Sequence, residues 1–180
     1  MTINNSSEPL YLKFPTLEED YEWGTYLREY RENTPNDIPL GHSTHMPYAD
    51  WLTRINDSHN GLNLPAGIVP STAFFLMQGN RILGHISIRH NIDSPFLAMY
   101  GGHIGYGVRP TARKKGFATK MLSLALAKCK ELGLDEVLVT CKKDNIGSAK
   151  TIINNGGILR TEIFSPEENC IFQHYTISIK

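Results

Sequence analysis

The sequence predicts a single α/β domain that spans residues 1–180. The chain is long enough for one full-sized core, and its 41% hydrophobic and 20% charged residues are typical of a soluble globular protein. Short apolar runs bounded by Gly, Pro and Asn predict strands. Between them lie segments whose apolar residues recur at three- and four-residue steps, the period of an amphipathic helix.

The charge balance excludes several classes of function. Eighteen basic and eighteen acidic residues give a net charge of zero, so we expect no nucleic-acid partner and no membrane partner. No apolar stretch is long enough to span a bilayer, and residues 1–7 lack the pattern of a secretory leader, which predicts a cytoplasmic protein. Cys129, Cys141 and Cys170 are odd in number and lie far apart in apolar runs, which favours reduced thiols and no metal site.

The N-terminal third is predicted to hold one strand and two helices. Thr16 and Glu19 have the spacing of a capping box, so a helix should open there. A second helical pattern begins at Pro47, after a linker rich in helix breakers that is long enough to form a lid or a substrate wall. In order, we expect a strand at 9–14, a helix from Thr16 to Tyr30, the linker at 33–42 and a helix from Pro47 to Ile55.

A hairpin opens the rest of the chain, because two apolar runs flank the turn Gly79-Asn80. The strand predicted after the later helix has the composition of a strand buried on both faces, next to a parallel neighbour. In order, we expect strands at 72–78 and 81–89, a glycine-punctuated strand from Gly101 to Val108, a helix from Phe117 to Leu132 with Gly133 as its C-cap, a strand at 136–141, a short helix at 148–155, and closing strands at 158–164 and 170–179.

The segment Arg113-Lys114-Lys115-Gly116-Phe117-Ala118 matches the pattern Arg/Gln-x-x-Gly-x-Gly/Ala at a helix start. Backbone N–H groups are unpaired there and suit a phosphate. Taken alone the pattern is weak, since solvated loops before helices share it. Its context is more specific: a strand with Val108 precedes it, and a helix, a second strand and Asp144-Asn145 follow.

This order of motifs, over residues 72–157, resembles the GNAT superfamily of acyl-CoA-dependent N-acetyltransferases. The resemblance implies a mixed, mostly antiparallel twisted sheet with helices on both faces and a splayed central strand pair. It also implies an enzyme that uses acetyl-CoA as cosubstrate, without a metal. The acetyl group would pass directly to a primary amine, with no covalent enzyme intermediate.

The resemblance also assigns the coenzyme A site. The loop before the third helix would bind the pyrophosphate, the glycine-rich strand would pair with the pantetheine arm, and the polar residues after the next strand would face the cofactor. The residues so assigned are Tyr106, Gly107, Val108, Arg113, Lys114, Lys115, Gly116, Phe117, Ala118, Thr119, Asn145 and Ser148. Strand alternation places His103, Gly105 and Gly107 on one face, where the missing side chains should leave a trough.

The chain departs from the family pattern at the general acid. Many members carry a tyrosine on the short helix, where this chain has Ile152, and Gly156-Gly157 replaces a common Gly-aromatic pair. In this respect the chain is similar to the branches that acetylate protein N-termini. The missing tyrosine also keeps a second function open, a non-catalytic acyl-CoA-binding or sensing module.

Two residues are candidates for catalysis. His103 is the candidate general base, because imidazole titrates near neutral pH; the alternative is a hydrogen-bonded histidine at a strand start. Tyr106 is a candidate acid or orienting group, and the alternative is a packed core tyrosine. The acceptor stays open between a small-molecule amine and a peptide or protein amine, and a homodimer is compatible with the sequence.

Overall fold

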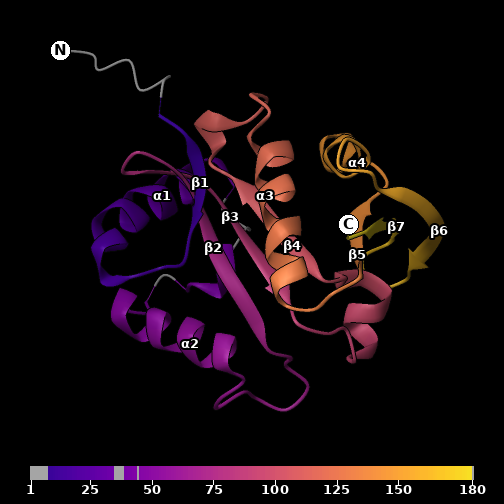
Figure 1. Cartoon of the computed structure of the whole chain (residues 1–180), viewed down its shortest axis with the longest axis horizontal. Coiled ribbons are helices and arrows are strands. Elements are labelled where there is room, and N and C mark those ends of the chain that lie inside the picture. Colours follow the sequence, from indigo (N-terminus) through magenta and orange to yellow (C-terminus); the bar gives the residue numbers. More distant parts are fainter. Residues whose placement is uncertain (1–7, 35–38, 44, 180) are drawn as a thin grey trace.

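The computed structural model describes residues 8–34, 39–43 and 45–179. Residues 1–7, tested above for a leader, and residues 35–38 of the predicted linker lie outside this part of the chain. The described strands form two sheets with antiparallel pairing, one in the order β1-β2-β3-β4 and one in the order β5-β7-β6 (Figure 1). The strands are β1 (Leu10–Lys13), β2 (Ser71–Gln78), β3 (Arg81–Arg89), β4 (Ile104–Val108), β5 (Glu136–Lys142), β6 (Ile158–Ser165) and β7 (Cys170–Ser178).

Helices cover both faces of the first sheet, as predicted. One face packs against α1 and α2 and the other against α3, while α4 lies beside α3 and β5 (Figure 1). The helices are α1 (Asp20–Asn33), α2 (Tyr48–Asn60), α3 (Phe117–Glu131) and α4 (Ile146–Ile153). No helix in the described ranges has the length and apolar character needed to cross a membrane.

The first two helices begin and pack as their sequence predicts. The Thr16–Glu19 capping box is present and opens a short 3-10 turn that leads into α1. Trp23 of α1 is buried and stacks on Trp51 of α2 and Phe75 of β2, with ring centroids 5.0 and 4.9 Å apart. This aromatic cluster fixes both helices on one face of the sheet.

The second core lies between the sheets and α3. The predicted hairpin forms β2 and β3, and Ile86 and Ile88 of β3 are fully buried against Met121 and Leu122 of α3. Ile152 of α4 is fully buried in the same cluster. The position where many relatives have a tyrosine is therefore occupied by a core side chain.

Two details differ from the prediction. The chain from Leu97 to Gly101 forms a π-helical turn, so β4 starts only at Ile104. β5 was predicted to have a parallel neighbour, but its ladder partner is the antiparallel strand β7. Its other edge contacts the start of β4 and then separates from it.

Candidate active site

β4 and β5 meet at one point and then separate. The His103 N–H donates to the Leu138 carbonyl at 2.7 Å, and the Leu138 N–H donates to Nδ1 of His103 at 2.9 Å. Gly102 has a φ of +60°, and a Cβ on it would lie 2.6 Å from the Leu138 carbonyl oxygen, so this joint requires glycine. Beyond the joint, no ladder connects β4 to β5 in the described ranges. The splayed strand pair implied by the resemblance is present.

The splay leaves one backbone edge of β4 without a strand partner among the described residues, although the Val108 carbonyl on it accepts from the Tyr30 hydroxyl and from Arg113. On its other edge β4 bonds to β3, from the His103 carbonyl, which accepts from the Arg89 N–H at 2.8 Å, to the Arg109 N–H. Because backbone groups alternate along an antiparallel strand, the odd-numbered residues of β4 bond to β3 and the even-numbered residues face the opening. Gly107, predicted to contact the cofactor, therefore directs its backbone toward β3. The open edge carries the backbone groups of Ile104, Tyr106 and Val108.

The predicted glycine trough exists only in part. A Cβ on Gly107 would lie 2.5 Å from the imidazole of His85 and 2.5 Å from the Tyr30 hydroxyl, so these side chains fill the space. A Cβ on Gly105 would have Nη2 of Arg89 as its nearest neighbour, at 3.7 Å. The expectation of a continuous trough is wrong because buried groups of α1 and β3 occupy the Gly107 half of it.

Three predicted site residues come together where α4 begins. The Tyr106 hydroxyl lies 2.8 Å from Oγ of Ser148, across the opening between β4 and α4. The Ser148 N–H donates to Oδ1 of Asn145, which caps the helix at 3.1 Å. Burial raises the pKa of Tyr106 to about 12, so its hydroxyl is protonated at neutral pH.

The loop before α3 presents backbone N–H groups, as predicted. Gly116 is the N-cap, with a φ of +82°, and the first backbone bond of the helix runs from the Lys120 N–H to the Gly116 carbonyl at 3.1 Å. Within the described part of the chain, the N–H groups of residues 114–119 have no acceptor. This group of donors at a helix N-terminus suits an anion such as a phosphate.

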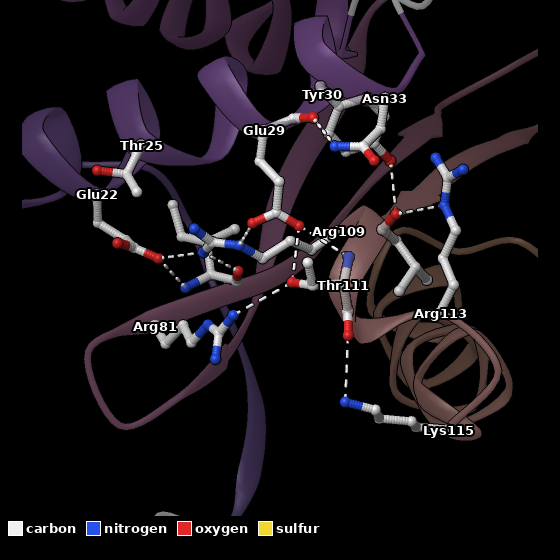
Figure 2. A network of polar contacts seen from close by, with 12 residues as sticks. Glu22, Thr25, Glu29, Tyr30, Asn33, Arg81, Arg109, Thr111, Arg113 and Lys115 are labelled. Carbon is white, nitrogen blue, oxygen red and sulfur yellow. Dashed lines mark hydrogen bonds and ion pairs between the residues drawn. The ribbon is translucent and has the colours of Figure 1, made fainter. Parts of the chain in front are cut away.

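Two basic side chains of this loop bond to the protein itself (Figure 2). Arg113 donates from Nε to the Val108 carbonyl at 3.1 Å, and its guanidinium carbon lies 5.5 Å from the centre of the Tyr30 ring. Lys115 donates from Nζ to the Thr111 carbonyl at 3.1 Å. The side chains of Arg113 and Lys115 therefore shape the loop, and its free donors are the backbone N–H groups.

A buried ion-pair network braces the end of β4 and was missed in the sequence. Arg109, only 3% exposed, donates to Glu22 at 2.5 Å and to Glu29 at 2.7 Å, so it fixes β4 to α1 (Figure 2). Glu29 also accepts from the N–H and the hydroxyl of Thr111. Burial by itself would raise the pKa of Glu29, but the bonds from Arg109 and Thr111 outweigh it and lower that pKa.

A cleft with a volume of about 880 Å³ opens on the α1–α2 side of the sheet. It lies between α2, the segment 63–71 that follows it, and the polar face of β3, and it reaches Gly105 and Tyr106 of β4. His85, Ser87 and Arg89 of β3 line it at every second position. This alternation of polar residues within an apolar strand was the sequence signal that could have identified the cleft wall.

The two histidines nearest the opening are both in hydrogen bonds. His103 uses Nδ1 to accept from Leu138, and burial lowers its pKa. His85 lies 2.7 Å from the Tyr26 hydroxyl, and burial lowers its pKa to about 3, so it is neutral at neutral pH. In residues 8–34, 39–43 and 45–179, no cluster of three or more His, Cys, Asp or Glu side chains could hold a metal ion.

Comparison with known proteins assigns the family. The acetyltransferase (GNAT) domain model matches residues 16–157, whereas no curated protein matches. Among solved structures, RimL, a ribosomal L7/L12 α-N-protein acetyltransferase in complex with coenzyme A, has a TM-score of 0.72 at 14% identity, over 98% of this chain and 97% of that one. The microcin C7 self-immunity acetyltransferase MccE, in complex with acetyl-CoA and AMP, has a TM-score of 0.70 at 16% identity, over 97% and 94%.

A GNAT-family acetyltransferase from Bacillus anthracis has a TM-score of 0.63 at 20% identity, over 95% of both chains. At these identities the likeness in structure shows a shared fold. The family model spans most of the sequence, from the capping box to the end of α4. The chain therefore belongs to the GNAT acetyltransferase family.

Proposed function

We propose that this chain transfers the acetyl group of acetyl-CoA to a primary amine, by direct attack of the amine on the thioester. The observation that carries the proposal is the open edge of β4, which runs from the joint at Gly102 to the loop before α3. Its backbone groups can pair with the pantetheine arm as an added strand would. The unpaired N–H groups of residues 114–119 can bind the pyrophosphate.

The reacting carbonyl would lie beside Tyr106, at the middle of this edge. The N–H groups of Tyr106 and Val108 face the opening and can hold the oxyanion that forms when the amine attacks. When the thiolate leaves, the Tyr106 hydroxyl can donate its proton to the sulfur, and the proton that the amine nitrogen loses can return to Tyr106 through Ser148, whose Oγ lies 2.8 Å away. Burial raises the pKa of Tyr106 to about 12, which makes its hydroxyl a weaker acid, so the support for this role is its position beside Ser148.

His103 has one nitrogen committed to the joint between the strands. If it acted as general base through Nε2, its proton would have to sit on Nδ1, which now accepts from Leu138. We therefore propose that His103 positions β4 against β5. Replacement by asparagine, described below, separates this role from general base catalysis.

Turnover with a panel of amines tests the proposed function. Purified protein with acetyl-CoA should release coenzyme A only when an acceptor amine is present, and mass spectrometry should find the acetylated amine. Binding of acetyl-CoA without acetylation of any amine would instead favour the alternative function, a non-catalytic acyl-CoA-binding module, which was considered because Ile152 replaces the usual tyrosine. The paired hydroxyls of Tyr106 and Ser148 at the opening favour the enzyme.

We further propose one acyltransferase domain over residues 1–180, acting in the cytoplasm. The joint between β4 and β5 connects the two sheets, and the family model extends into both of them, which supports a single unit. The acceptor would be a small-molecule amine or a peptide amine. RimL, by its name, acts on a protein α-amine, and MccE is a self-immunity enzyme, so the similar structures do not favour one class.

A further inference from the structure

Arg89 places a guanidinium in the wall of the cleft, next to β4. Its Nη1 donates to the carbonyls of Gly101 and Gly102, both at 3.0 Å, which fixes the side chain against the joint between the sheets. Its Nη2 faces Gly105, where no side chain intervenes. Nη1 is therefore anchored at the joint, whereas Nη2 makes no hydrogen bond to the described residues of the cleft wall.

This cation has no carboxylate partner in the described part of the chain. Arg109, at the other end of β4, pairs with Glu22 and Glu29, but none of the ion pairs of the described residues includes Arg89. Burial lowers the pKa of Arg89, which records the cost of keeping an uncompensated charge there. An anion that entered the cleft would remove this cost and gain charge-assisted hydrogen bonds.

The rest of the cleft also favours an anion. Arg54 and Asp57 of α2 are the other charged residues that line it. The Asp57 carboxylate already accepts from Nδ2 of Asn63 at 3.0 Å, so two arginines face one engaged carboxylate. Apolar side chains lie at the mouth of the cleft, where Ile68 and Phe96 are both more than half exposed.

We propose that the acceptor is a small amine with a carboxylate one or two carbon atoms from its nitrogen, as in an apolar amino acid, and that Arg89 binds this carboxylate. The spacing follows from Gly105, which lies beside both Nη2 of Arg89 and the residues proposed to hold the thioester. The guanidinium would also lower the pKa of the bound amine and so favour its nucleophilic form. This inference rests on the proposed acetyl transfer.

Matched acceptors test the inference on the wild-type protein. We would compare kcat/KM for L-leucine, L-leucinamide and isopentylamine with saturating acetyl-CoA at pH 8. Leucine should be preferred by roughly 10- to 100-fold over the amide, the range of a charge-assisted pair. The amine of the amide is the less basic of the two, so its basicity cannot produce this preference. Equal values for the acid and the amide, or a preference for a peptide N-terminus, would overturn the inference.

A binding measurement separates this inference from the proposed function. Trp51 lines the cleft, so its fluorescence can report binding of leucine or leucinamide to the protein with coenzyme A, where no acetyl transfer occurs. Tighter binding of leucine without turnover would support the carboxylate site at Arg89 and overturn the proposed acetyl transfer. Turnover with equal binding of leucine and leucinamide would support the proposed acetyl transfer and overturn the carboxylate site at Arg89.

Two variants test whether the preference for leucine over leucinamide depends on Arg89. Arg89→Gln keeps a donor for the Gly101 and Gly102 carbonyls but removes the charge, so the preference for leucine over leucinamide should fall to within about twofold. Arg160→Gln makes the same change on an exposed strand, outside the cleft, and should keep the wild-type preference. A preference that persists in a folded Arg89→Gln protein would overturn the assignment. If that variant did not fold, the wild-type comparison would still decide.

Discussion

The two ends of β4 differ in how their charges are compensated. At the C-terminal end, Arg109 is buried against two carboxylates, and one of them also binds the start of the phosphate loop. At the N-terminal end, the side chain of Arg89 bonds to two backbone carbonyls, those of Gly101 and Gly102, has no carboxylate partner among the described residues, and lines an open cleft. The first arrangement is complete without a ligand, whereas the second leaves a charge for a ligand to pair with.

The comparison separates two roles within the five residues of β4: one end stabilises the fold, and the other end lies beside the proposed acceptor site. The braced end holds the loop whose N–H groups we propose to bind the pyrophosphate, and a loop that is already fixed loses less conformational entropy when the cofactor binds. The open end faces the side from which an acceptor would enter. Substitutions at four positions along β4 and its flanks test this division, and we order them by the size of the expected effect.

Arg109→Met should have the largest effect, and it should act on folding. Removing the cation leaves Glu22 and Glu29 without their partner, so the free energy of unfolding should fall by about 3 kcal/mol at pH 7. Urea denaturation measures this change, with Arg160→Met as the exposed control. A loss of stability no larger than that of the control would show that the ion pairs of Arg109 with Glu22 and Glu29 do not stabilise the fold.

The pH dependence of this effect has a definite sign. The pKa of Glu29 is lower in the folded state than in the unfolded chain, where it is about 4.3. Its contribution is therefore complete above pH 4.3 and is lost as the pH falls through the folded value. The difference in stability between wild type and Arg109→Met should shrink in that range.

Gly116→Trp should act on cofactor affinity. The side chain would cover the N–H groups at the start of α3, and we expect acetyl-CoA to bind at least roughly tenfold more weakly by calorimetry. Gly133→Trp is a matched control, since Gly133 also has a positive φ and open space around its Cβ, but lies beyond the other end of α3. Equal affinities of the two variants would remove the phosphate site from this loop.

Tyr106→Phe should act on turnover. It removes the hydroxyl that pairs with Ser148 but keeps the ring, so kcat should fall by about tenfold or more while the Kd of acetyl-CoA stays within threefold. Rate and calorimetry on the same preparation measure both. The control Tyr11→Phe removes a hydroxyl from the exposed strand β1, far along the sheet from β4. An unchanged kcat would show that the Tyr106 hydroxyl is not the proton donor and that Tyr106 is a packed side chain.

His103 should show the smallest effect, and two substitutions distinguish its roles. His103→Ala removes the acceptor for the Leu138 N–H and should cost about 1 kcal/mol of stability. His103→Asn places an oxygen near the position of Nδ1, so stability and kcat should return to near wild type. A kcat that stayed low in the asparagine variant, together with a pH–rate profile that had lost its acidic limb, would identify His103 as the general base.

Much of the fold was predictable because its signals are local. The capping box at Thr16, the hairpin turn at Gly79 and the glycine before α3 each act within a few residues, and each lies where the sequence placed it. The π-helical turn at Leu97–Gly101 was not predicted, since its end is set by contacts between Gly102 and β5. The antiparallel ladder between β5 and β7 was not predicted either, because strand pairing depends on contacts far apart in sequence.

The site divides in the same way. Tyr106, Asn145 and Ser148 were each predicted from a motif, but the bond between Tyr106 and Ser148 spans 42 residues of chain. Arg109 appeared in the sequence only as a residue after a strand, and its partners lie 80 and 87 residues earlier. Arg89 gave the weak signal of a charged residue at the end of an apolar strand.

The sequence by itself determined the order of helices and strands, the loop that offers N–H groups before α3, and the absence of a tyrosine at position 152. These features depend on backbone conformation and on side-chain period, which a few neighbouring residues set. The tertiary structure decided which charges are neutralised: among the residues it describes, it brings two carboxylates to Arg109 and none to Arg89. Burial and partners arise from contacts between distant segments, so only the folded chain separates an arginine that braces the fold from one that faces a ligand.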